Sequence, residues 1–103
     1  MKVGDRVTIT TVQNTTTISV TGRIRLLFTA AEVDRLPEAA ALSEQAHNSC
    51  RGGSWKRVAA IQHHFYGDVR TIVAFEESGG NWRDHDGRPC TITRSQAQPT
   101  RII

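Results

Sequence analysis

The chain has 103 residues, of which 38% are hydrophobic and 22% charged, the composition of one folded domain and not of a disordered segment. No apolar run approaches the length of a membrane span and the first residues lead into no signal-peptide core, so we expect a cytoplasmic protein without a membrane partner. The net charge of +3 is too small to identify a nucleic-acid-binding protein by itself, and in this setting Cys50 and Cys90 are expected to be reduced thiols.

The N-terminal region predicts a β-hairpin that is buried on one face. Apolar side chains alternate with Thr, Ser and Arg along residues 17–28, the pattern of a half-buried strand, and residues 3–12 supply its partner. With the turn midway between the two strands, Ile9 lies opposite Val20, so the two apolar faces agree. Gly22 takes an inward position, where it indicates a bulge or a close approach of another segment.

A helical segment follows this hairpin. Thr29 and Glu32 have the spacing of a capping box, in which each side chain bonds to the backbone of the other residue. Pro37 interrupts the helical pattern because it has no amide donor. We therefore expect one short turn and then a helix over residues 37–47, with an apolar stripe of mostly small side chains that packs on a sheet.

Residues 54–77 predict a second hairpin, with apolar side chains on both of its faces. We place the turn at Gly67 and Asp68, which puts Ile61 opposite Ala74. A surface hairpin normally has one apolar and one polar face. The pattern therefore predicts that a partner, such as a second copy of the chain, covers the outer face. The residues expected at this interface are Val58, Tyr66, Val69, Val73 and Phe75.

The C-terminal part adds one more strand to the expected sheet. Turn signals surround a short segment at Trp82, and residues 90–93 predict the last strand. Residues 1–94 are expected to form one domain, and residues 95–103 a loosely ordered tail. The expected fold class is α+β, a small antiparallel sheet in the order β-β-α-β-β-β with one helical segment packed on one face. The alternative is a partly closed SH3-like barrel with an inserted helix.

Two short, overlapping segments at the N-terminus resemble segments of known protein families. The run GDRV at residues 4–7 is similar to the opening of small SH3-like proteins. The run VGDRVTIT at residues 3–10 is similar to a framework segment of antibody light-chain variable domains, whose Cys-Trp-Cys spacing this chain lacks. Neither run extends further, so we assign no family.

Basic residues concentrate on the predicted strands. Twelve of the thirteen Lys and Arg residues lie outside residues 29–50, which hold four acidic side chains. A positive sheet face with exposed aromatic side chains fits contacts to the phosphates and bases of a nucleic acid, although no RNP1 or GXXG motif is present. The candidates for phosphate contact are Arg6, Arg23, Arg25, Lys56, Arg57 and Arg70, and the candidates for stacking are Trp55, Phe65, Tyr66 and Trp82.

The residue types that usually carry catalysis or bind metal lack a recognisable spacing. His63 and His64 are adjacent in a strand, so they point to opposite faces and do not share one ion, and no CxxC, HxxxH or HxH pair occurs. The run DHDG at residues 84–87 begins like a calcium loop, but no acidic residue closes it, so we interpret it as a turn. We predict no catalytic residue, no metal site and no cofactor.

These features favour a small non-catalytic binding module. It would self-associate or dock a partner through residues 54–77, and its basic face would contact nucleic acid. One alternative is a structural, adaptor or inhibitor protein of a mobile element that acts by protein–protein contact only. The other is a small enzyme that uses His63 or His64 as a general base.

Overall fold

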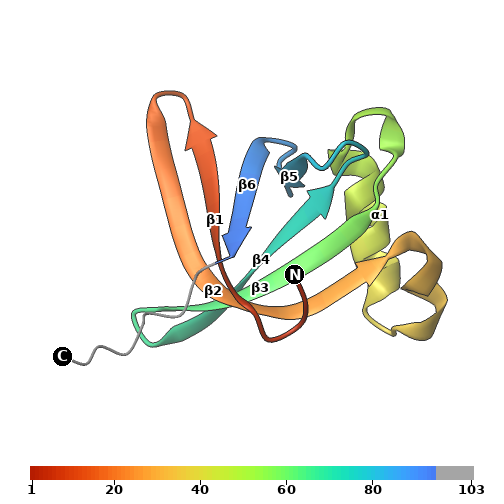
Figure 1. Ribbon diagram of the computed structural model, residues 1–103, viewed down its shortest axis with the longest axis horizontal. Helices are drawn as coiled ribbons and strands as arrows, with labels where there is room; N and C mark the ends of the chain where they lie inside the picture. The colour runs from red at the N-terminus through yellow and green to blue at the C-terminus, as the bar shows by residue number, and fades with distance from the viewer. Residues whose placement is uncertain (95–103) are drawn as a thin grey trace.

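The computed structural model describes residues 1–94 and shows six antiparallel strands closed into a barrel, with a helical insertion between the second and third strands (Figure 1). Each strand pairs with the next along the chain, and the last pairs with the first. The strands are β1 (Arg6–Gln13), β2 (Thr16–Thr29), β3 (Arg57–Phe65), β4 (Asp68–Glu76), β5 (Trp82–Asp84) and β6 (Pro89–Arg94). The insertion consists of the 3-10 helix η1 (Ala30–Arg35), the α-helix α1 (Ala39–Ser49) and the 3-10 helix η2 (Arg51–Gly53).

The α+β class is confirmed, but the sheet is closed and not open, which agrees with the barrel alternative. β6 pairs with β1, and β5 joins β4 to β6. The predicted sheet had no separate strand for β5, because three residues are too few to show an alternating pattern. The expected tail at residues 95–103 lies outside the described residues. No helix within residues 1–94 is long and apolar enough to cross a membrane.

The β1–β2 hairpin has the register expected from its alternating pattern. Ile9 pairs with Val20, and Asn14 takes the positive φ of 57° in the turn. On the outer face, hydroxyl pairs link the strands, with the oxygens of Thr8 and Thr21 2.8 Å apart. The second half of β2 pairs with β3, and its register shifts by one residue after Ile24, a bulge that bends the long strand from one neighbour to the other.

The β3–β4 turn differs from the prediction by one residue. Tyr66 and Gly67 form the two-residue loop, with φ values of 50° and 82°, as a type I′ turn requires. Ile61 therefore pairs with Ile72 and not with Ala74. Because the shift moves each pairing by two residues, the paired residues of β3 and β4 keep the faces predicted for them. Trp55, which precedes β3, packs with Val58 and not on the predicted face with Ile61.

The barrel interior holds one of two hydrophobic clusters. The buried members of the interior cluster are Val7, Ile9, Ile24, Ala59, Ile61, Ala74, Trp82 and Cys90. An ion pair fills one end of the interior, where the Arg57 guanidinium bonds twice to the Glu76 carboxylate at 2.7 and 3.0 Å and lies over the Trp82 ring. The pair therefore closes this end of the barrel with charged groups that satisfy each other. No buried polar side-chain atom of residues 1–94 lacks a hydrogen-bond partner.

The second cluster lies outside the barrel, between the β3–β4 hairpin and the helical insertion. Its buried members are Phe28, Ala39, Ala46, Cys50, Val58 and Phe75. Figure 1 shows α1 beside the ends of β3 and β4 that are remote from their turn. The small side chains of α1 allow this close approach. The helix begins and ends two residues later than predicted, whereas the Thr29–Glu32 contact forms, with the Thr29 amide donating to the Glu32 carboxylate at 2.9 Å.

The helical insertion corrects the prediction that a partner covers the outer face of the second hairpin. Val58 and Phe75 are completely buried beneath it, and Val73 is half-buried at its edge. The alternating pattern correctly indicated that the outer face of this hairpin has to be covered. The cover comes from the chain itself, because the insertion folds back over the hairpin that follows it.

Candidate functional site

A basic hollow lies on the barrel surface where β1, β2 and β3 meet. Its volume is about 310 Å³. Arg6 and Arg23 are direct neighbours in the β1–β2 register, and Gln62 lies opposite Arg23 on β3. The hollow is lined by Arg6, Thr21, Gly22, Arg23, Gln62, His63 and His64. Sequence reasoning placed the two arginines on one face of the first hairpin, and the pairing of β2 with β3 brings them together with both histidines.

The two arginines of the hollow have no acidic partner in the described part of the chain. No carboxylate of residues 1–94 lies within ion-pair distance of Arg6 or Arg23. One Arg23 nitrogen donates to the Gly4 carbonyl at 3.2 Å. Like charges directly opposite each other on paired strands repel, so an anion in the hollow would relieve an unfavourable contact.

Gly22 permits the close approach of β2 and β3 beside the hollow. A Cβ atom at this position would lie only 2.4 Å from the Gln62 carbonyl oxygen. The sequence left a bulge or a close approach open for this glycine, and the structure has the close approach. The absent side chain therefore also leaves space in the floor of the hollow.

The turn of the β3–β4 hairpin, which follows the hollow's His64 along the chain, carries exposed aromatic and basic side chains. Tyr66 is 93% exposed and Phe65 44% exposed, and their rings contact edge to face with centroids 4.5 Å apart. The Arg70 guanidinium lies 4.5 Å from the Phe65 ring centroid, a cation–π contact. Arg70 pairs with His63, which connects this exposed tip to the hollow. We call Phe65, Tyr66, Val69 and Arg70 the hairpin tip.

The other basic candidates lie elsewhere. Arg57 belongs to the ion pair inside the barrel, where hydrogen bonds from its guanidinium lower the pKa of the Glu76 carboxyl and the carboxylate in turn raises the pKa of Arg57. Arg25 lies 3.6 Å from the Glu38 carboxylate, with both side chains exposed. Lys56 precedes β3, at the end of that strand remote from the turn. Only three of the six predicted basic residues therefore cluster at the hollow and the tip.

The aromatic candidates also divide into two groups. Trp82 is buried in the barrel interior, and half-buried Trp55 packs edge to face on Phe28 with centroids 6.0 Å apart. Phe65 and Tyr66 remain exposed. Of the five residues predicted at an interface, Tyr66 and Val69 are the exposed ones, and Val69 is 53% exposed.

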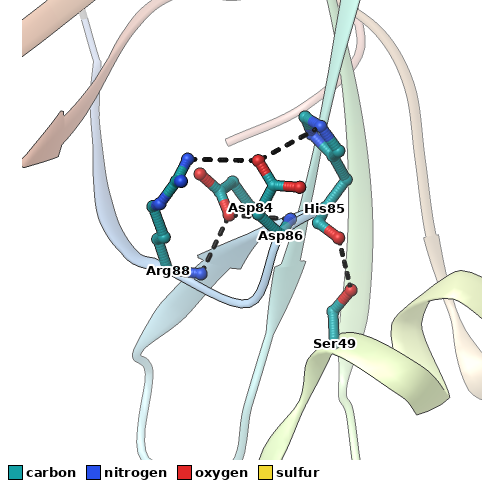
Figure 2. Close-up of polar contacts among 5 residues, drawn as sticks. All are labelled: Ser49, Asp84, His85, Asp86 and Arg88. Atoms are coloured by element: carbon teal, nitrogen blue, oxygen red, sulfur yellow. Dashed lines mark hydrogen bonds and ion pairs between the residues drawn. The ribbon is translucent and has the colours of Figure 1, made fainter. Parts of the chain in front are cut away.

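The β5–β6 turn forms the hydrogen bonds of a turn, as predicted. The buried Asp84 carboxylate accepts from the backbone amides of Asp86 and Arg88 at 3.0 and 2.9 Å (Figure 2). The Asp86 carboxylate lies 3.1 Å from an Arg88 nitrogen and 3.5 Å from His85 Nε2. Ser49 donates to the His85 carbonyl at 3.3 Å, which ties the end of α1 to this turn.

The two cysteines are free and buried. Burial raises the pKa of Cys90 to about 12, with the nearby Asp84 charge adding to the effect, and burial raises that of Cys50 as well. Both therefore stay protonated near neutral pH, which makes them poor nucleophiles and poor metal ligands. Within residues 1–94, no group of three or more His, Cys, Asp or Glu side chains gathers in a metal-binding arrangement.

Comparisons of the chain with protein-family models, with curated proteins and with solved structures found no match.

Proposed function

We propose that this protein is a non-catalytic binding module for single-stranded nucleic acid, which binds phosphates in the basic hollow and bases on the hairpin tip. The observation that carries the proposal is that β3, whose Gln62, His63 and His64 line the hollow of the Arg6–Arg23 pair, continues directly into the turn with the exposed Phe65 and Tyr66 rings. Single-stranded nucleic acids are bound by this combination of a positive groove and aromatic platforms. A duplex keeps its bases stacked, so its bases would not reach these rings.

The backbone of Tyr66 supports the proposal independently. This residue has φ of 50°, a conformation that Asn, Asp or Gly adopts at lower cost than tyrosine in a type I′ turn. Its ring contributes little burial to the fold, because 93% of the residue is exposed. A strained and exposed aromatic residue at the end of a hairpin is better explained by contact with a ligand than by stability.

Fluorescence anisotropy with short labelled random oligonucleotides tests the proposal. Arg6, Arg23 and Arg70 provide two or three phosphate contacts, so the plot of log K against log salt should have a slope of about −1.4 to −2.1 for a single strand. Arg23→Gln should reduce the magnitude of this slope by about 0.7. Duplex DNA of the same length should bind more weakly.

Arg35→Gln is the matched control, since Arg35 is exposed on η1, away from the hollow, and carries the same charge. It should leave both affinity and slope unchanged. Equal losses in Arg23→Gln and Arg35→Gln would show that only net charge matters. Absence of binding at low salt would overturn the proposal.

A protein partner at the hairpin tip is the second candidate function, and the exposure of Val69 beside Tyr66 favours it. Among the described residues 1–94, no other segment covers this part of residues 54–77. Sedimentation velocity of the wild type and of Val69→Glu tests self-association through the tip. A concentration-dependent dimer that Val69→Glu abolishes supports it, and a wild-type monomer at all concentrations excludes it.

A further inference from the structure

The mouth of the barrel holds a second cavity, which shares no residue with the basic hollow. Its volume is about 160 Å³. Aliphatic side chains of three strands form most of its wall. Polar groups come from Thr11 and Gln13 of β1, from Asp84 at the end of β5 and from His85, which follows it. The lining residues that matter here are Ile9, Ile18, Val20, Ile72, Asp84 and His85.

Asp84 brings a buried carboxylate to this cavity. Only 7% of the residue is exposed, and it lies on the same face of β5 as Trp82, directed into the barrel. Its register neighbour on β4 is Ala74, whose small side chain leaves the carboxylate room. The sequence analysis compared Asp84 with the start of a calcium loop and interpreted it as a turn residue, because a strand of three residues gives no signal for its inward direction.

One oxygen of this carboxylate has no partner among the described residues. Oδ1 of Asp84 accepts both backbone amides of the turn (Figure 2). No donor of residues 1–94 bonds to Oδ2, which is open to solvent, because every buried side-chain oxygen of these residues has a partner. The neighbouring cations are engaged elsewhere. Arg83 bonds to the Glu77 carboxylate at 2.7 Å, and Arg88 lies 3.1 Å from the Asp86 carboxylate.

The free Oδ2 can accept a hydrogen bond from a cationic donor, and such charge-assisted hydrogen bonds are stronger than those between neutral groups. The aliphatic wall favours a cation that carries an alkyl chain over a fully hydrated metal ion. No Phe, Tyr or Trp ring lines the cavity, so the aromatic cage that recognises quaternary ammonium groups is missing from the described lining. At about 30 Å³ for each water-sized group, the volume accommodates about five non-hydrogen atoms, the size of a butylammonium ion or of a lysine side chain.

We propose that the barrel mouth binds a primary alkylammonium group, with the ammonium on the Asp84 carboxylate and the methylene chain against Ile9, Val20 and Ile72. The ligand is either a free aliphatic amine or the lysine side chain of another protein, since both present the same chemistry. His85 lies at the rim of the cavity, where its ring, 67% exposed, leaves the entrance open to solvent.

Titration of the full chain with n-butylammonium chloride, followed by amide chemical shifts, tests this site. We expect saturable shifts at Ile9, Ile72 and Asp84, with a dissociation constant on the order of 1 mM for so small a ligand. Asp84→Asn keeps an oxygen for the two turn amides and removes only the charge, so the variant should fold normally. It should bind about tenfold more weakly or not at all, in line with loss of a charged hydrogen bond.

Two further ligands define the chemistry. The neutral n-butanol has the same size and should bind much more weakly than the ammonium ion. Nα-acetyl-lysine N-methylamide distinguishes the sources: binding of this compound assigns the site to a lysine side chain, and binding of butylammonium alone assigns it to a free amine. The proposal is overturned if butylammonium gives no saturable shifts at these residues, or if a correctly folded Asp84→Asn variant binds it as well as the wild type.

Discussion

Replacing Tyr66 with asparagine separates the stability of the fold from binding at the hairpin tip. The left-handed backbone of Tyr66, with φ of 50°, costs an ordinary residue about 1–2 kcal/mol, whereas asparagine followed by glycine is the pair most favoured in this turn. Tyrosine regains about 0.5 kcal/mol from the edge contact with Phe65, whose centroid lies 4.5 Å away. Little other contact is lost, because the side chain is 93% exposed.

We therefore expect Tyr66→Asn to raise the free energy of unfolding by about 0.5–1.5 kcal/mol, the difference between these two terms. Urea denaturation followed by circular dichroism measures this change, and the slope against urea should stay constant. The same variant should bind a single-stranded oligonucleotide about 5- to 150-fold more weakly, because one base–aromatic stack contributes about 1–3 kcal/mol.

Two results would refute this reasoning in different ways. A loss of stability of about 1 kcal/mol or more would mean that the ring supports the hairpin and that backbone strain at this turn is small. An unchanged affinity for the oligonucleotide, in a variant with native circular dichroism, would remove Tyr66 from the binding surface. If Tyr66 serves ligand binding and not stability, the Tyr66→Asn variant should be more stable than the wild type and should bind the oligonucleotide more weakly.

Three other substitutions test the account of the fold. Phe75→Ala should lower the free energy of unfolding by about 3–5 kcal/mol, because Phe75 is fully buried beneath the helical insertion. The oligomeric state measured by sedimentation should not change. A variant that is as stable as the wild type but dissociates would show instead that Phe75 lies at an interface between chains. Glu76→Gln should cost about 1–3 kcal/mol near neutral pH. Arg57 lowers the pKa of the Glu76 carboxyl below its ordinary value of 4.5. The wild type should therefore lose the stability contributed by this ion pair as the pH falls through the lowered pKa. In thermal melts, the melting temperature of the Glu76→Gln variant should depend less on pH in the acid range than that of the wild type. Gly22→Ala should destabilise by about 1–3 kcal/mol in urea, since its Cβ would lie 2.4 Å from a backbone oxygen, and an unchanged midpoint would contradict that contact.

The alternating pattern predicted the strand faces better than it predicted the strand pairing. In the β1–β2 hairpin, one polar and one apolar face left a single register, and Ile9 pairs with Val20 as expected. In the β3–β4 hairpin, both faces are apolar, so the pattern accepts two registers that differ by two residues. The turn decided between them, and Gly67 takes the second loop position, where the sequence had suggested the first.

The candidate site was predictable in part, because the register that sets Ile9 opposite Val20 also sets Arg6 opposite Arg23. Arg6 and Arg23 were named because they are basic residues on a polar strand face, and pairing across β1 and β2 makes them neighbours. Arg57 has the same composition signal, but it enters the barrel because Glu76 lies opposite it. No local pattern distinguishes an exposed arginine from one inside the barrel, since the acidic partner of Arg57 comes from a strand that is distant in the sequence.

The sequence by itself determined what depends on neighbouring residues: the two hairpins, the faces of their strands, the turn at Asp84 and the capped start of the helical segment. Periodicity and capping are local properties, because a strand alternates and a helix end bonds within a few residues of itself. Tertiary structure alone decided the closure of the sheet, the cover over Phe75, and the assembly of the basic hollow and the cavity at Asp84. Each of these requires pairing or packing between distant segments, whose geometry depends on bends, bulges and small side chains that a linear pattern does not encode.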